Sequence, residues 1–253
     1  MSKIVILGAT GSLGKNVVQQ AVAAKHDVSV VVRTLSKLPA DVRDYVSVSQ
    51  CDLSAASTND LIAMLSGHDA VINTAGVVTE GQVFVDLIDH LVTGLEAMST
   101  DDRPACWFLA GAALLDIDDS GRRGVDLPRV SSTYWPHRVN FERIRRSNLD
   151  WRLLCPGPMI EQPPLGQSKL RISLDRLPVK VPAFGRVLPG ALFLPVFAYL
   201  IPEMIISYAD AASLMLGNLA RRGEMSHHRV GVALPVGMRG QKDRWAAQPK
   251  NAA

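Results

Sequence analysis

Three glycines stand three residues apart near the start of the chain, at Gly8, Gly11 and Gly14. An apolar run over residues 4–7 precedes them, and an amphipathic segment over residues 12–24 follows. In a strand–turn–helix unit such glycines permit a sharp turn, close approach of backbone to a ligand, and tight packing of the helix on the sheet. The free N–H groups of the helix N-terminus would then bind the pyrophosphate of a dinucleotide. We expect this phosphate site to comprise Gly8, Thr10, Gly11, Ser12, Leu13 and Gly14.

The residue that ends the second predicted strand selects the cofactor. An acid there would hydrogen-bond the 2′-hydroxyl of NAD, but the residue is Arg33. A guanidinium pairs with a 2′-phosphate in a forked geometry, and Lys37 offers a second cation. The sequence therefore predicts NADP(H) as the cofactor.

Two further loops should line the nucleotide. Asp52 and Leu53 follow the third predicted strand, and Thr74, Ala75 and Gly76 follow the fourth. We expect Asp52 to accept a hydrogen bond from the adenine amino group and Leu53 to pack on the adenine face. Gly76 would let the backbone pass close to the ribose.

Strand-like and helix-like segments alternate along the first two thirds of the chain. Apolar runs predict strands at 4–7, 28–33, 45–49, 70–73, 107–110 and 151–154, and helical periodicity predicts helices at 12–24, 57–66, 80–98 and 134–147. This alternation is typical of an α/β fold with a doubly wound parallel sheet of the Rossmann type.

Prolines interrupt the pattern over residues 156–206, which we expect to form an apolar insert on the substrate side. A helix over 207–221 and a strand over 230–234 follow. We predict one dinucleotide-binding domain over residues 1–237 and a polar tail over 238–253.

Residues 187–202 form an apolar run without a charge. The run is too short, and too rich in proline, for a lone membrane-spanning helix. Three uses stay open for it: a lid over a substrate pocket, a dimer surface, or a flap that touches a membrane. The oligomeric state does not follow from the sequence.

Composition excludes several other classes. The net charge of +3 and the scattered Lys and Arg residues argue against nucleic acid as a partner. Adjacent His227 and His228 have no ligand partners at metal spacing, so we predict no metal site. No signal peptide is visible, and we expect a cytoplasmic protein.

Several motifs together resemble the atypical short-chain dehydrogenases, in particular the NAD(P)H-binding group with biliverdin IXβ reductase, flavin reductase and NmrA-like proteins. The motifs are Gly-Ala-Thr-Gly-Ser-Leu-Gly at 8–14, Val-Val-Val-Arg at 30–33, Asp-Ala-Val-Ile-Asn-Thr-Ala-Gly at 69–76, and Leu-Asp-Trp-Arg-Leu-Leu-Cys-Pro-Gly-Pro at 149–158. The resemblance covers residues 3–165 and again 206–210. It is specific for fold and cofactor, and only weakly specific for the substrate.

The resemblance implies where the nicotinamide end lies. It puts Ala110 and Gly111 beside the nicotinamide, where relatives often carry Ser or Thr, and it puts His137 nearby. It also places four residues of one loop against the carboxamide: Pro156, Gly157, Pro158 and Met159. Flavin-reductase relatives have a histidine in this loop, where Pro158 stands here.

Tyr134 and Arg138 have the Tyr-x-x-x-Lys spacing of the classical short-chain enzymes, in which lysine helps tyrosine protonate a carbonyl oxygen. The serine of that set is missing, and Pro136 predicts that the helix begins there and leaves Tyr134 outside it. Tyr134, Arg138 and His137 are therefore candidates for the catalytic positions. Tyr134 is alternatively an aromatic wall of the pocket.

The absence of a complete acid set favours acceptors that take their proton from water. The sequence predicts an NADPH-dependent reductase that transfers hydride to a flat conjugated small molecule such as a flavin, quinone or tetrapyrrole. Two alternatives stay open: an NmrA-like dinucleotide-sensing regulator without turnover, and a scaffold or assembly factor on the same fold.

Overall fold

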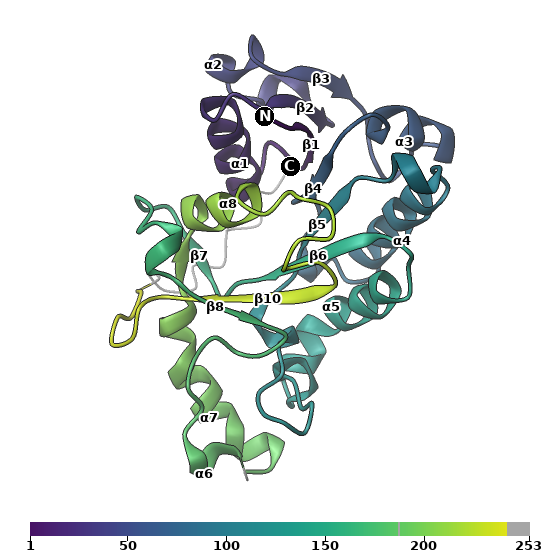
Figure 1. The fold of residues 1–253 in the computed structure, drawn as a ribbon. Coiled ribbons are helices and arrows are strands. Elements are labelled where there is room, and N and C mark those ends of the chain that lie inside the picture. Colours follow the sequence, from purple (N-terminus) through teal and green to yellow (C-terminus); the bar gives the residue numbers. More distant parts are fainter. Residues whose placement is uncertain (187, 242–253) are drawn as a thin grey trace, which may run out of the picture.

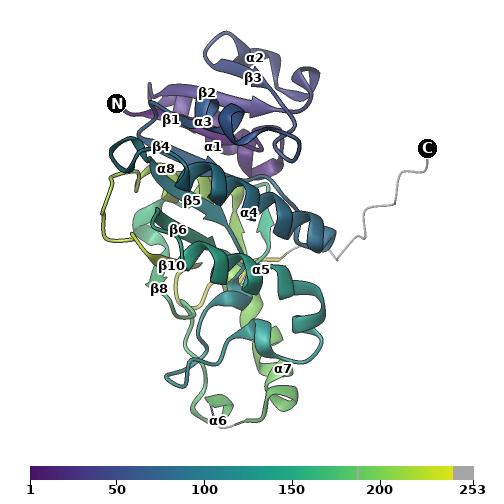
Figure 2. The same cartoon turned by 90° about the vertical axis from the view of Figure 1, so that its right-hand side faces the viewer.

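The computed structural model describes residues 1–186 and 188–241, and within them the chain forms an eight-stranded sheet with helices on both faces (Figures 1 and 2). The strand order is β3-β2-β1-β4-β5-β6-β10-β8, and every neighbouring pair is parallel except β10 and β8. The strands of this sheet are β1 Lys3–Leu7, β2 Asp27–Val32, β3 Ser47–Gln50, β4 Ala70–Asn73, β5 Ala105–Leu109, β6 Asp150–Cys155, β8 Arg171–Leu174 and β10 His228–Ala233. The predicted doubly wound parallel sheet is confirmed.

The helices cover the sheet in two layers. On one face α1 packs beside α8, and on the other α3, α4 and α5 lie side by side (Figure 2). The α-helices are α1 Ser12–Ala23, α2 Ala40–Arg43, α3 Thr58–Leu65, α4 Gln82–Glu96, α5 Val130–Arg145, α6 Ala183–Arg186, α7 Gly190–Leu200 and α8 Tyr208–Leu216. Short 3-10 helices are η1 Leu35–Lys37, η2 Val78–Glu80, η3 Thr100–Asp102, η4 Ala112–Leu114, η5 Gly124–Asp126, η6 Gln167–Lys169 and η7 Ile201–Met204.

Alternation along each strand divides the core into two halves. In β1, Ile4 and Ile6 face the layer of α1 and α8, while Val5 and Leu7 face the layer of α3, α4 and α5. All four side chains are fully buried or nearly so. A strand buried on both faces reads as a continuous apolar run, which is why the sequence predicted β1 so directly.

The chain order creates a crevice at one edge of the sheet. From β1 the chain moves outward to β2 and then β3, and it returns to place β4 on the other side of β1. The strand order reverses at this point, and the loops after β1 and β4 diverge to opposite faces. In doubly wound sheets, ligands bind outside the carboxyl ends of the strands at such a reversal.

Helix α5 begins earlier than predicted. It starts at Val130, so Pro136 lies inside it and Tyr134 belongs to the helix. The prediction that Pro136 starts the helix is wrong, because residues 130–135 are already helical and the cost of a proline at this position is small. Proline then costs the helix one hydrogen bond, to the carbonyl of the exposed Ser132.

The proline-rich segment 156–206 is only partly an insert. Its strand β8 is the antiparallel edge of the main sheet, and β7 Met159–Ile160 pairs with β9 Ile206–Ser207 in a separate two-stranded sheet. Of the predicted tail, residues 238–241 are described, and the Gly240 amide donates to the Pro202 carbonyl at 2.8 Å. Residues 242–253 lie outside the described residues.

Candidate functional site

The turn after β1 is held in a shape that only glycine allows. Gly8 has a φ of +78°, and a Cβ on Gly8 would lie 2.6 Å from the Ala75 amide nitrogen. A Cβ on Gly14 would lie 2.1 Å from the Gly8 carbonyl oxygen. Both contacts are with backbone, which cannot move away as a side-chain tip can. The two glycines therefore let α1 and the loop after β4 close on the turn.

The first turn of α1 offers unpaired N–H groups. Gly11 is the N-cap, and no side chain caps the helix. The first intrahelical bond joins the Lys15 amide to the Gly11 carbonyl at 2.9 Å, so the amides of Ser12, Leu13 and Gly14 have no acceptor within the helix. Free amides and the positive end of the helix dipole suit a pyrophosphate.

Thr74 joins the loop after β4 to the turn after β1. Its hydroxyl lies 2.8 Å from the Leu7 carbonyl oxygen and 3.2 Å from that of Gly8, so it donates between them. The Asn73 side chain accepts from the Ala75 amide at 3.1 Å. Gly76 follows with a φ of +98°, and a Cβ there would meet the Phe84 ring at 2.3 Å. These contacts fix both walls of the crevice.

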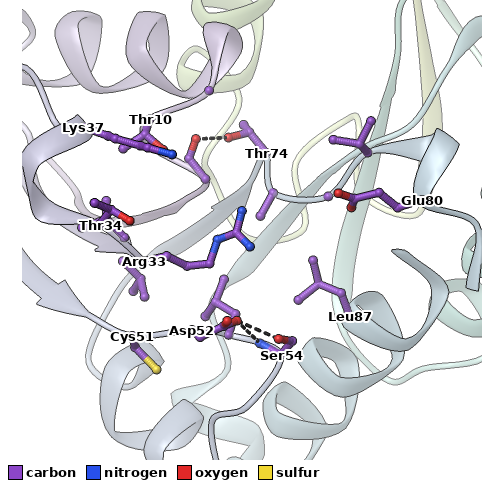
Figure 3. Close-up of a pocket in the computed structure, with 18 of the residues that line it drawn as sticks. Thr10, Arg33, Thr34, Lys37, Cys51, Asp52, Ser54, Thr74, Glu80 and Leu87 are labelled. Atoms are coloured by element: carbon purple, nitrogen blue, oxygen red, sulfur yellow. Dashed lines mark hydrogen bonds between the residues drawn. The ribbon is translucent and has the colours of Figure 1, made fainter. Parts of the chain in front are cut away.

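A cleft of about 570 Å³ opens between these walls at the carboxyl ends of β1 to β4 (Figure 3). Ten predicted cofactor residues line it: Gly8, Thr10, Gly11, Arg33, Lys37, Asp52, Leu53, Thr74, Ala75 and Gly76. Sequence reasoning missed nine further lining residues: Val31, Val32, Thr34, Cys51, Ser54, Val77, Glu80, Val83 and Leu87. The signal for Thr34, Cys51 and Ser54 was present, since they flank predicted residues.

The Arg33 side chain extends into the middle of the cleft from the end of β2 (Figure 3). It is exposed, and no hydrogen bond or ion pair of its guanidinium is found among the described residues. Its backbone carbonyl accepts from the Gln50 side chain at 3.3 Å, which ties the strand end to β3. Lys37 lies in the same wall (Figure 3). Both cations are therefore available to an anionic ligand.

Asp52 is partly engaged by its own loop. Its carboxylate accepts from the Ser54 hydroxyl at 2.7 Å and from the Ser54 amide at 3.0 Å. These hydrogen bonds, with the charge of Arg33, lower the pKa of Asp52. The acid is thus ionised at neutral pH, and one oxygen remains for an adenine amino group.

Three residues predicted for the phosphate site do not line the cleft: Ser12, Leu13 and Gly14. Neither do the two catalytic candidates Tyr134 and Arg138, nor the residues implied for the nicotinamide end: Ala110, Gly111, His137, Pro156, Gly157, Pro158 and Met159. Two of their loops are joined, because the Ala112 amide donates to the Pro156 carbonyl at 2.8 Å. A Cβ on Gly157 would lie 2.6 Å from the Met204 carbonyl oxygen, so glycine is needed there for packing against η7.

His137 is the buried titratable group of this second region. Its ring stacks on Tyr134 with centroids 6.1 Å apart, and it meets the edge of Phe84 at 5.8 Å. A Cβ on Gly111 would lie 3.3 Å from the His137 Nε2. Burial lowers the pKa of His137 to about 4, so the imidazole is neutral at physiological pH.

The Tyr134 and Arg138 pair does not form a hydrogen bond in the described residues. Arg138 is exposed, whereas His137 beside it is buried. No group of three or more His, Cys, Asp and Glu residues that could hold a metal occurs in residues 1–186 and 188–241. Of the two adjacent histidines, His228 pairs through its Nδ1 with the Asp175 carboxylate at 2.5 Å, at the first residue of β10.

Solved structures share this fold at low sequence identity. A protein provisionally described as an NADH-flavin reductase, from Streptococcus pneumoniae, superposes with a TM-score of 0.67 at 20% identity, over 92% of this chain and 100% of that one. The anaerobilin reductase of Escherichia coli O157:H7 gives 0.62 at 13% identity, over 96% and 100%. A short-chain dehydrogenase/reductase from Veillonella parvula gives 0.63 at 18%, over 97% and 100%.

The sequence itself carries the family assignment. A family model described as NAD(P)H-binding matches residues 8–180, which is more than half of the chain. The matched range includes the glycine turn, Arg33, the loops after β3 and β4, and His137. The chain therefore belongs to the NAD(P)H-binding protein family.

Proposed function

We propose that the chain is an NADPH-dependent reductase that transfers hydride to a flat conjugated small molecule, such as a flavin, a quinone or a tetrapyrrole. The bound nicotinamide would supply the hydride. The residues of the chain bind the dinucleotide, orient it, and exclude water from its reactive end.

The cleft supports NADPH over NADH. Arg33 stands where an acid would bind the 2′-hydroxyl of NAD, and its guanidinium has no partner among the described residues. Lys37 and the hydroxyl of Thr34 line the same wall. Together they offer a 2′-phosphate charge-assisted hydrogen bonds on one side of the cleft. The pyrophosphate of the same NADPH molecule would accept hydrogen bonds from the free amides at the start of α1.

One observation carries the choice of acceptor: the second region holds a neutral imidazole and no engaged proton donor. His137 is buried and uncharged, and the loop Leu109–Ala112 has no hydroxyl. The Tyr134 ring stacks on His137, and its hydroxyl has no hydrogen-bond partner among the described residues. Reduction of an isolated carbonyl depends on a positioned acid, whereas a conjugated acceptor delocalises the added charge and takes its proton from water. The residues present therefore suit a stacked, conjugated acceptor.

Turnover tests the proposal. The purified chain is mixed with NADPH and a panel of flavins, quinones and a tetrapyrrole, and absorbance of the reduced nicotinamide is followed. We expect oxidation with at least one conjugated acceptor and none with simple aldehydes or ketones. Tight NADPH binding without oxidation across the panel would contradict the reductase.

A second candidate is a dinucleotide-sensing regulator without turnover. It is favoured by the fact that the cleft is lined by residues of the adenosine side, while His137 is buried between Phe84 and Tyr134. A protein that only reads the cofactor needs no acceptor beside it. Binding that discriminates NADPH from NADP⁺, with no turnover, would support this candidate in place of the reductase.

A further inference from the structure

Helices α6 and α7 expose a set of large apolar side chains, which we term the α7 surface. Phe184 of α6 is 63% exposed, and Leu192 and Tyr199 of α7 are 62% and 63% exposed. Pro195, between them on the same helix, is also exposed. Residues 192, 195 and 199 recur at helical spacing, so they share one face of α7.

The opposite face of α7 is fixed to the core. Phe193, Phe197 and Leu200 are buried within the larger apolar cluster. Arg122 adds to this attachment, with its guanidinium 4.9 Å from the centre of the Phe193 ring. The α7 surface is therefore held outward. It lies away from the cleft, since none of the described residues of 160–205 lines the cleft.

Helix α4 shows what a solvent-facing helix of this chain looks like. Four of its exposed positions are polar, Gln82, Asp86, Asp89 and Thr93, and Val83, which lines the cleft, is its one exposed large apolar side chain. Helix α7 has no charged residue at all. An exposed apolar helix face of this kind is typical of a surface that contacts a membrane or another protein.

The charged residues near the α7 surface favour contact with an anionic lipid surface. In the sequence from residue 177 to residue 202 the charged residues are Lys180 and Arg186, and there is no acid. Arg239 lies with its guanidinium 4.3 Å from the centre of the Tyr199 ring. Glu203, the next acid along the chain, is paired with Arg171 at 2.8 Å and lies 4.0 Å from the Arg239 guanidinium, so the two cations outnumber the one acid there. Cations beside exposed apolar and aromatic side chains match anionic headgroups above acyl chains.

The position of the surface in the molecule fits contact with a flat layer. In both views α6 and α7 lie at one end of the molecule, and α2 and β3 lie at the other (Figures 1 and 2). No helix in the described part of the chain is long and apolar enough to cross a membrane. Contact through the α7 surface would therefore be interfacial.

We propose that the α7 surface docks on an anionic lipid bilayer. Phe184, Leu192 and Tyr199 insert at the level between headgroups and acyl chains, and Lys180 and Arg239 face the headgroups. The proposal is independent of the reductase, since none of these residues lines the cleft.

Vesicle flotation tests the docking. The full chain is mixed with vesicles of phosphatidylcholine, alone or with phosphatidylglycerol, and the floated fraction is measured. We expect flotation with phosphatidylglycerol that weakens as salt is raised. Leu192→Glu should lower the partition coefficient about tenfold or more, because it puts a charge at the apolar boundary. Lys180→Glu should lower it about tenfold on the anionic vesicles only.

Tyr45→Glu is the matched control for Tyr199→Glu. Tyr45 is 68% exposed, close to the 63% of Tyr199, and it precedes β3 at the other end of the molecule. Tyr199→Glu should reduce flotation and Tyr45→Glu should leave it unchanged, with equal thermal unfolding for both. Absent flotation of the unmodified chain, or equal loss in both variants, overturns the proposal. A further outcome overturns it: the chain binds no lipid, sediments as a dimer, and dissociates when Leu192 is replaced by Glu. That outcome would assign the α7 surface to contact with a second copy of the chain.

Discussion

The cleft, which we term the open end, and the region around His137, which we term the buried end, are built from opposite kinds of residue. At the open end, Arg33, Lys37 and Asp52 are exposed side chains that line the cleft. At the buried end, His137 and Tyr134 lie on a helix, and His137 is buried and neutral. The open end can select a ligand by charge, and the buried end only by shape and packing. Under the proposed function, the first would choose the cofactor and the second the acceptor.

The largest expected effect comes from disrupting the glycine turn beside the cleft. Gly14→Ala would set a Cβ 2.1 Å from the Gly8 carbonyl oxygen. Since backbone cannot give way, we expect a loss of about 3 kcal/mol in the free energy of unfolding and loss of dinucleotide binding. Urea unfolding and titration calorimetry measure the two effects.

Gly11→Ala is the control within the same turn. Its Cβ would lie 3.4 Å from the Gly8 carbonyl oxygen, and its φ of −76° suits alanine. Stability should change little, while pyrophosphate binding falls because the methyl group faces the ligand. Equal destabilisation by both substitutions would show that close packing of α1 is not what Gly14 provides.

A pH titration tests the buried end. Burial lowers the pKa of His137 to about 4 in the folded chain, against about 6.5 when unfolded. Between these values the unfolded chain binds more protons, so stability rises with pH and is lost as the pH falls. From neutral pH to pH 5 the loss from this group is about 2 kcal/mol. His137→Phe should remove that part of the slope in urea unfolding at successive pH values.

His26→Gln supplies the comparison for this slope. His26 is half-buried, and its Nδ1 accepts from the Ser2 amide at 3.2 Å. The acid slope should persist in this variant. If His137→Phe keeps the full slope as well, the acid sensitivity belongs to other groups and the imidazole is not held neutral by burial.

The fold could be predicted from the sequence wherever an element is buried on both faces. The apolar run 70–73 coincides with β4, because no solvent-facing position interrupts it. Strand β8 was missed, since its side chains alternate between exposed and half-buried and prolines surround it. In α7, Pro195 indicated a break, yet the helix continues because the carbonyl that loses its partner belongs to exposed Ala191.

The site could be predicted where motif and strand end coincide. Arg33 and Thr74 directly follow a strand and Asp52 lies two residues beyond one, so their place at the sheet edge required only the order of the strands. Glu80 and Leu87 come from η2 and α4, which reach the cleft through tertiary packing that no local spacing encodes. The buried state of His137 also depends on neighbours distant in sequence, including Phe84.

The last test addresses the open end, where we expect an effect on binding and none on stability. Arg33→Ala should weaken NADPH binding about 10- to 100-fold, since a hydrogen-bonded charge pair contributes about 1.5–3 kcal/mol, and it should leave NADH binding unchanged. Arg146→Ala, on a largely exposed side chain of α5's C-cap, is the control and should alter neither Kd. Because Arg33 reaches the cleft without a partner among the described residues, its removal leaves no buried charge and stability should hold. A preference for NADPH that survives Arg33→Ala would place the 2′-phosphate at other groups, Lys37 first. It would contradict the proposal that Arg33 selects the cofactor by its charge.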